Sequence, residues 1–127
     1  MAIVIDTSAL IEYFLSSRKG EIVKEAIEDS SDSVIIPPIV LSEFASKLLR
    51  KGLNPNSFIA ALQEFTIFVN LDPDTAIKAG KLHAELRKIE KNIGMADCLI
   101  MQIAEENDAE IISLDSHFKH YKNSRIL

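Results

Sequence analysis

Short apolar segments alternate with longer amphipathic ones along the chain, and this alternation restricts the folds that the chain can adopt. The apolar segments are rich in β-branched residues, which is typical of strands buried on both faces. Such an order favours a mainly parallel sheet with helices on both sides. We therefore predict an α/β fold, a three-layer α/β/α sandwich with a central sheet of four to five strands, formed by residues 1–127 as one domain. The predicted strands are Ala2–Ile5, Val34–Ile36, Thr66–Leu71 and Glu110–Leu114.

Capping residues, prolines and glycines set the expected boundaries of the helices. Asp6-Thr7-Ser8 supplies N-cap chemistry for a helix that continues to Leu15. Gly20 is expected to break this helix or to separate it from the next one. The remaining predictions are helices over Glu21–Asp29, Ile39–Gly52, Ser57–Phe65, Asp74 to about Lys91 and Met95–Asn107, a polar turn at Ser30–Ser33, and a short helical turn over Ser116–Tyr121.

Apolar residues at helical spacing mark the faces that are expected to be buried. The only cysteine, Cys98, is expected to be an inert buried thiol, and His83 is expected to be exposed. The expected core positions outside the strands include Val40, Leu41, Phe44, Ala45, Leu48 and Leu49, Leu82, Leu86 and Ile89, and Phe65 and Phe68.

The composition is that of a protein with a substantial core and an acidic surface. Hydrophobic residues make up 47% of the 127 residues, so a core can form without disulfide or metal staples. The longest apolar run, "VIIPPIVL", is far shorter than the roughly 20 residues that span a bilayer. We expect a cytoplasmic protein without membrane contact. The formal charge of −5 argues against a general nucleic-acid coat protein but is compatible with an enzyme that holds phosphate through metal ions.

Four carboxylates occupy positions that the expected fold could bring together. Asp6 follows the first strand and Asp115 follows the last predicted one, and ligands of open α/β sheets bind outside the carboxyl ends of strands. Glu43 and Asp97 lie in apolar helical surroundings. Each acid also has a simpler interpretation on its own. The three aspartates could cap helices, and Glu43 could face solvent.

A cluster of these four acids would need neutralisation. Two unit charges 4 Å apart repel by about 4 kcal/mol at an effective dielectric near 20. Raised pKa values or bound cations can relieve this repulsion. Oxygen ligands suit Mg²⁺ or Mn²⁺ rather than zinc, and the sequence has no zinc-type spacing of cysteine and histidine.

The segments around the acids resemble a known family. "VIDTSALI", "LSEF", "GMADCLIMQIA" and "ISLDSHF" are similar to the four acidic motifs of PIN-domain ribonucleases, in the order and spacing of the small VapC-type toxins. The resemblance runs from Ile3 to about Phe118. It implies a metal-dependent endoribonuclease that hydrolyses RNA phosphodiester bonds with Mg²⁺ or Mn²⁺. It also implies a toxin of a toxin–antitoxin pair, a small antitoxin partner and a homodimer.

The resemblance assigns roles to individual residues. It implies that the catalytic, metal-binding acids are Asp6, Glu43, Asp97 and Asp115. Ser8 and Ser113 would support the site, although the family more often has threonine in the place of Ser113.

Contacts with RNA would come from basic residues near the acids. Lys47 lies one helical turn after Glu43 and shares its face. A solvated helix face remains the alternative for most of these cations. The candidates are Lys47, Arg50, Lys51, Lys119 and Lys122, with His117 and His120 as further possible contacts.

Other α/β proteins fit the sequence less well. A phosphoacceptor receiver would need a pair of acids after the first strand and a lysine after the last, and both are missing. A haloacid-dehalogenase-type phosphatase would need an aspartate where Ser8 stands. Two alternatives within the PIN fold stay open, an RNA-processing nuclease without a toxin role and a catalytically silent module that binds RNA or protein.

Overall fold

The structure is a computed structural model that describes residues 2–29 and 33–127. Four strands form one sheet in the order β2-β1-β3-β4, and every neighbouring pair runs parallel. The α/β prediction is therefore confirmed. The strands are β1 (Ile3–Ile5), β2 (Val34–Ile35), β3 (Glu110–Ser113) and β4 (Ser124–Ile126).

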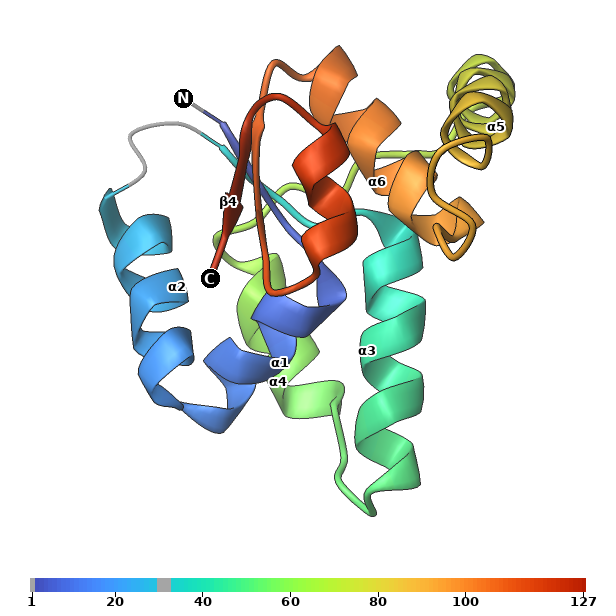
Figure 1. Cartoon of the computed structure of the whole chain (residues 1–127). Coiled ribbons are helices and arrows are strands. Elements are labelled where there is room, and N and C mark those ends of the chain that lie inside the picture. The colour runs from blue at the N-terminus through green and yellow to red at the C-terminus, as the bar shows by residue number, and fades with distance from the viewer. Residues whose placement is uncertain (1, 30–32) are drawn as a thin grey trace.

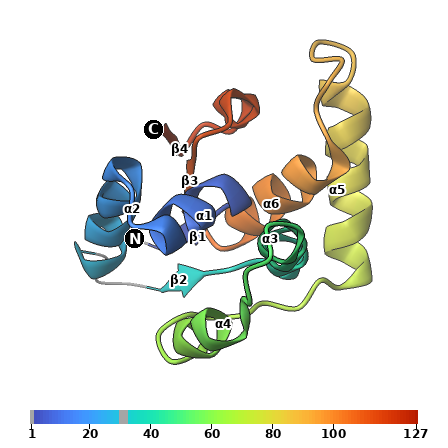
Figure 2. The ribbon, with the colours of Figure 1, turned by 90° about the horizontal axis from the view of Figure 1, so that it is seen from below.

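Helices cover both sides of this sheet. Figure 2 shows α2 on one side of the strands and α6 on the other, with α5 packed outside α6. The helices α1 and α3 are neighbours near the carboxyl ends of the strands (Figure 1). The helices are α1 (Thr7–Leu15), α2 (Arg18–Asp29), α3 (Pro38–Arg50), α4 (Asn56–Gln63), α5 (Pro73–Leu86) and α6 (Met95–Glu106), with a 3₁₀ helix, η1 (Ser116–His120), between β3 and β4.

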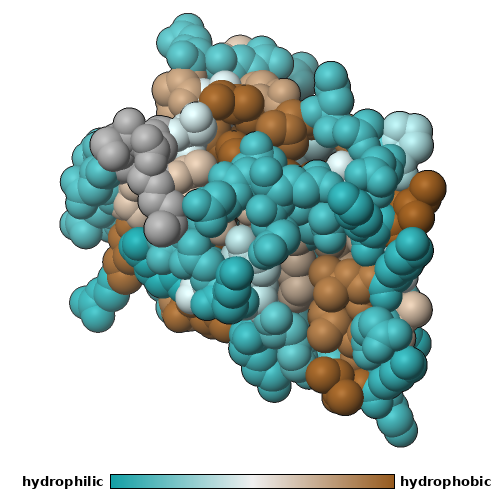
Figure 3. All heavy atoms as spheres, turned by 90° about the horizontal axis from the view of Figure 1, so that it is seen from above, coloured by the Kyte–Doolittle hydropathy of each residue, from teal (hydrophilic) through white to brown (hydrophobic). Residues whose placement is uncertain are grey.

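The core forms around the two central strands, β1 and β3. Val4, Ile5, Ile111 and Ile112 are fully buried there, as their apolar sequence predicted. Burying one such side chain contributes about 1.5–3 kcal/mol. No helix in the described part of the chain is both long and apolar enough to cross a membrane. The surface seen in Figure 3 is mostly hydrophilic, with apolar side chains in separate patches.

The two edges of the sheet differ from the prediction. The segment Thr66–Leu71 is not a strand, because only Ile67 pairs with β2, through a single parallel bridge to Ile35. Phe65 beside it is 45% exposed, so its assignment to the core was wrong. At the other edge, β4 was not predicted. Its residues are mostly exposed, and the apolar pattern that marks a buried strand is therefore missing.

Three helical predictions also need correction. The helix α5 ends at Leu86 rather than near Lys91, and Ile89 beyond it is 72% exposed. Leu49 is 61% exposed because it lies off the buried face of α3. His83 is partly buried, with Nε2 3.3 Å from the carbonyl oxygen of Ile93.

The polar turn predicted at Ser30–Ser33 falls mainly on residues 30–32, which lie outside the described residues.

Gly20 has a different role from the predicted helix break. The break comes earlier, where Ser16 takes a left-handed conformation (φ +54°) after α1. Gly20 lies inside α2, and a Cβ atom added to it would stand 2.0 Å from the carbonyl oxygen of Glu12. The absence of a side chain therefore allows α2 to approach the backbone of α1.

The substitution Gly20→Ala should destabilise the fold, because the clash is with backbone that cannot move aside cheaply. We expect a loss of about 1–3 kcal/mol or more in the free energy of unfolding, measured by urea denaturation. Gly80→Ala is the matched control, since nothing lies within 4 Å of a Cβ at that helical position. It should stabilise α5 by about 0.5–1 kcal/mol. Equal effects of the two substitutions would contradict the close approach of α1 and α2.

Candidate metal centre

Asp6 occupies the turn between β1 and α1, at the carboxyl end of a central strand. Its side chain is 4% exposed. One oxygen, Oδ1, accepts hydrogen bonds from the backbone N–H of Ala9 (3.1 Å) and from Ser8 Oγ (2.7 Å). The other, Oδ2, accepts from Ser113 Oγ (2.6 Å). Asp6 is thus the N-cap of α1, as its simpler interpretation predicted, and it also belongs to a wider polar cluster.

Opposing influences act on the ionisation of Asp6. Burial is the largest, and it raises the pKa of Asp6 above its usual value of 3.8. The hydrogen bonds from Ser113, Ser8 and the Ala9 N–H favour the ionised form and lower the pKa. The negative charge of Asp115 raises it further. Asp6 and Asp115, 109 positions apart in the sequence, therefore sense each other in the fold.

The two serines connect Asp6 to the chain after β3. Besides donating to Asp6, Ser113 Oγ accepts a hydrogen bond from the N–H of Asp115 (2.8 Å). Ser8 Oγ likewise accepts from the N–H of Leu114 (3.0 Å). The structure thus places both predicted support residues against Asp6, and each fixes the backbone that leads to Asp115.

Asp97 and Asp115 approach each other around an imidazole. Asp97 lies in the first turn of α6, where Oδ2 accepts from the N–H of Gly94 (3.1 Å). Asp115 caps η1, with Oδ1 accepting from the N–H of His117 (2.9 Å). His117 Nδ1 lies 3.5 Å from Asp97 Oδ2 and 3.4 Å from Asp115 Oδ1. Ligand atoms of these three residues all lie within 4.8 Å of one another.

Glu43 joins this group from α3. Its Oε1 accepts a hydrogen bond from Thr7 Oγ1 (2.8 Å), which fastens α3 to the residue that follows Asp6. Burial is the main reason why the pKa of Asp97 is raised, and the charges of Asp115 and Glu43 add to it. The Gly94 N–H and His117 act in the opposite direction. The structure therefore brings all four predicted acids within electrostatic reach of at least one other.

The donor set fits a small divalent cation. Carboxylate oxygens are the ligands that Mg²⁺ and Mn²⁺ prefer. Burial, with a smaller contribution from neighbouring negative charge, raises the pKa values of Asp6 and Asp97, and a bound cation would stabilise their ionised forms. Among the residues that the structure describes, Asp97, Asp115 and His117 are the one group of three whose ligand atoms are spaced to hold an ion. Asp97, Asp115 and His117 could therefore hold one ion together, and Asp6 and Glu43 are electrostatically coupled to this group.

The PIN domain family matches residues 3–123 of the sequence. This chain belongs to the PIN domain family. The match covers almost the whole sequence and contains all four acids of the cluster.

Solved structures of toxin–antitoxin proteins share the PIN fold of this chain. A toxin–antitoxin complex from Klebsiella pneumoniae superposes with a TM-score of 0.75 at 21% identity, covering 97% of this chain and 95% of that one. VapBC2 from Rickettsia felis, bound to a promoter DNA fragment, gives 0.75 at 18% identity, covering 100% and 98%. VapC20 of Mycobacterium tuberculosis, a toxin that cleaves the sarcin-ricin loop, gives 0.72 at 16% identity, covering 93% of each chain. No curated protein sequence matches this chain.

Three contacts of this PIN domain site were not foreseen from its sequence. Thr7 binds Glu43, and His117 lies between Asp97 and Asp115. Glu90, in the loop before α6, accepts a hydrogen bond from His120 Nε2 (3.1 Å). That bond is the main reason why the pKa of Glu90 is lowered. Glu90 had been included in a predicted helix, and no local pattern pointed to its contact with η1.

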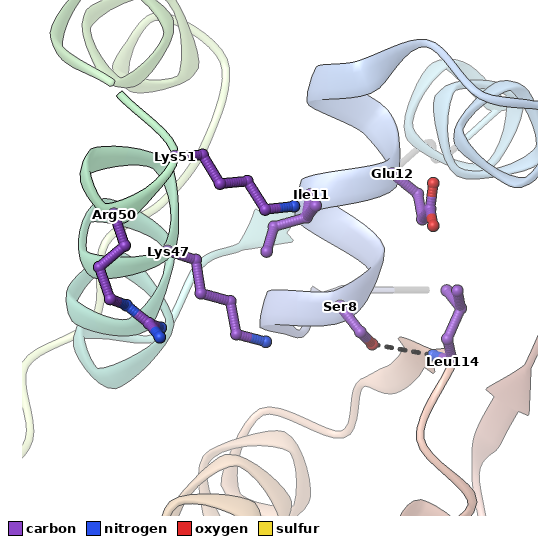
Figure 4. A pocket seen from close by; sticks show the side chains of 7 residues that line it. All are labelled: Ser8, Ile11, Glu12, Lys47, Arg50, Lys51 and Leu114. Carbon is purple, nitrogen blue, oxygen red and sulfur yellow. Dashed lines mark hydrogen bonds between the residues drawn. The ribbon is translucent and has the colours of Figure 1, made fainter. Parts of the chain in front are cut away.

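A cavity of about 390 Å³ begins beside Ser8 and runs between α1 and α3. Figure 4 shows Lys47, on α3, and Lys51, directly after α3, extending toward α1. The predicted basic residues on α3 therefore face this cavity rather than lying only on the outer side of the helix. The cavity is lined by Ser8, Ile11, Glu12, Lys47, Arg50, Lys51 and Leu114.

The raised pKa of Asp97 predicts a pH dependence of stability. Because the folded-state pKa lies above the unfolded value, the free energy of unfolding falls as pH rises through the interval between the two. Metal-free Asp97→Asn should therefore be no less stable than the parent at pH 7, and any advantage should vanish below about pH 4. Thermal unfolding with EDTA across this pH range measures the difference.

Asp72→Asn is the control for this prediction, since the N–H and hydroxyl of Thr75 lower the pKa of Asp72. Its charge stabilises the fold at neutral pH, so the substitution should bring no gain at pH 7.

Mn²⁺ should raise the Tm of the parent more than that of Asp97→Asn. An equal shift would show that Asp97 is not a ligand.

Proposed function

We propose that this PIN domain is a metal-dependent endoribonuclease that hydrolyses RNA phosphodiester bonds with Mg²⁺ or Mn²⁺. The observation that carries the proposal is the convergence of the four acids at the carboxyl edge of the sheet, where Asp97 and Asp115 lie close enough to share one ion. Membership of the PIN family supports a nuclease. Nothing in the site favours the silent binding module, because every acid of the four motifs is present.

The proposed roles follow from the contacts of each acid. Divalent ions in such sites activate water and offset the negative charge that develops on the phosphoryl group. Asp6 and Asp97 are the first candidates for direct ligands, because their pKa values are raised and a cation would stabilise their ionised forms. Glu43 would share an ion, held in position by Thr7. Asp115 would bind directly or through water, while Ser8 and Ser113 keep Asp6 oriented.

We further propose that the enzyme is the toxin of a toxin–antitoxin pair, blocked by a small antitoxin and forming a homodimer. The support is the similarity of fold to toxin–antitoxin proteins over 93–100% of this chain. Such a role requires a short reading frame for the antitoxin beside the gene. Its absence would favour an RNA-processing nuclease instead.

RNA would have to be held by local positive charge, because the chain as a whole carries −5. Lys47 and Arg50 line the cavity beside Ser8 and also a smaller one, of about 260 Å³, that includes Glu43. They are therefore our candidates for phosphate contacts next to the acids. Lys119 is a further candidate on η1, where its Nζ lies 3.8 Å from Glu90 Oε2.

Cleavage of RNA tests the proposed activity. The purified parent should cut single-stranded RNA with Mn²⁺ or Mg²⁺, and EDTA should abolish the cutting. Asp6→Asn and Asp97→Asn should each lower the rate by at least about 100-fold while circular dichroism shows an intact fold. Asp74→Asn, at an exposed acid paired with Lys78, should cut like the parent. Equal cutting by all variants would reveal a contaminant or a different site.

The phosphate contacts can be tested without cleavage, in the Asp97→Asn background. Lys47→Gln with Arg50→Gln should weaken RNA binding, measured by fluorescence anisotropy, at every sequence tested. The slope of log affinity against log salt should fall by about 0.7 for each phosphate that the double variant no longer neutralises. Lys88→Gln is the matched control, because Lys88 is exposed and pairs with Glu85. An unchanged slope in the double variant would place the RNA elsewhere.

A further inference from the structure

We propose that His117 supplies a nitrogen ligand to the divalent ion held by Asp97 and Asp115, and that Glu90 is the positioning residue that orients its imidazole. This inference rests on the proposed metal site and adds two residues, His117 and Glu90, to its four acids.

The distances around His117 carry the first step. Two ligand atoms at about 2.1–2.2 Å from one small ion, at angles of 90–110°, lie about 3.0–3.6 Å apart. His117 Nδ1 lies 3.5 Å from Asp97 Oδ2 and 3.4 Å from Asp115 Oδ1, within that interval for both oxygens. An imidazole at these distances can therefore share an ion with both carboxylates.

The turn that follows β3 places the ring near both carboxylates. His117 is the second residue of η1, and its backbone N–H donates to Asp115 Oδ1 (2.9 Å), which ties the backbone of His117 to this carboxylate. The side chain of His117 is three-quarters buried. A side chain whose freedom is already restricted loses less conformational entropy when it binds an ion.

Glu90 stands at the opposite ring nitrogen. Its Oε1 lies 3.9 Å from His117 Nε2, which is a distance for electrostatic attraction or a water bridge rather than a direct hydrogen bond. Metal-binding histidines commonly have a carboxylate on this outer side, where it favours a proton on Nε2 and leaves the lone pair of Nδ1 for the metal. Glu90 is itself held by His120 Nε2 (3.1 Å), so its carboxylate stays near the ring.

A nitrogen donor changes which ion the site prefers. Mn²⁺ also prefers oxygen ligands, but it accepts an imidazole nitrogen more readily than Mg²⁺, which is a harder cation and keeps oxygen ligands almost exclusively. His117→Ala should therefore lower the affinity for Mn²⁺ more than the affinity for Mg²⁺, measured by calorimetry. If His117 only neutralised the acids as a cation, its loss would strengthen the binding of both ions.

Pulsed EPR of the Mn²⁺-loaded protein tests the ligand directly. The parent, labelled with ¹⁵N-histidine, should show ¹⁵N hyperfine coupling to Mn²⁺, and His117→Ala should lose it. His83→Gln is the matched control that should retain it. If His117→Ala does not fold, His117→Gln removes the same imidazole and should lose the coupling. Bound Mn²⁺ without histidine coupling would overturn the inference and leave the metal site intact. Failure to bind Mn²⁺ at all would overturn both.

Glu90→Gln tests the positioning role separately. Loss of an outer carboxylate typically costs 10–100-fold in metal affinity, so we expect at least a tenfold weaker Kd for Mn²⁺ with the ¹⁵N coupling retained. Glu85→Gln is the control, because Glu85 lies near the end of α5 and pairs with exposed Lys88. An unchanged Kd in Glu90→Gln would contradict the role of Glu90.

Discussion

The burial of carboxylates beside one another at the carboxyl edge of the sheet is the constraint on which this site depends. Burial and the charge of Asp115 both raise the pKa of Asp6, and burial with neighbouring charges does the same for Asp97. Hydrogen bonds and packing elsewhere in the fold offset the cost of holding these acids together. The apolar strands β1 and β3 hold Asp6 beside Ser113, and Thr7 holds Glu43 against α1. Hydrogen bonds thus keep the acids together, and a divalent ion would complete the neutralisation.

The carboxyl edge of the sheet places a candidate phosphate-binding surface next to the acidic site. Parallel strands end at one side, so residues from distant parts of the sequence meet there. The helix α3 contributes Glu43 to the acids and Lys47 to the adjacent cavity, one turn apart. Positive charge therefore lies beside the acidic site although the whole chain is negative. An RNA strand could be held on one side of the site and cleaved within it.

Much of the fold and part of the site could be predicted because their signals are local. Buried central strands are visible as apolar runs, and Asp6 follows β1 directly while Asp115 comes two residues after the end of β3. Glu43 and Asp97 were singled out by apolar surroundings and by the resemblance to PIN motifs. Exposed β4 and the single bridge at Ile67 lack the apolar pattern of a central strand, which is why the edges of the sheet were misjudged.

Contacts between residues that are far apart in the sequence could not be predicted from local sequence patterns. Thr7 and Glu43 are 36 positions apart, and Glu90 and His120 are 30 apart. Their pairing depends on how α3 and the loop before α6 pack in three dimensions. The residues up to Glu90 favour helix, so the sequence predicts a longer α5. In the structure α5 ends at Leu86, and the loop after it brings the carboxylate of Glu90 to η1.

A crystal structure of the Mn²⁺-soaked protein, with diffraction recorded at the manganese absorption edge, would decide whether the acids form a metal centre. We predict an anomalous peak within about 2.0–2.4 Å of oxygens from at least two of Asp6, Glu43, Asp97 and Asp115. An ion bound only by other residues would contradict the account. So would the absence of a peak at a saturating Mn²⁺ concentration in crystals where no neighbouring molecule covers the four carboxylates.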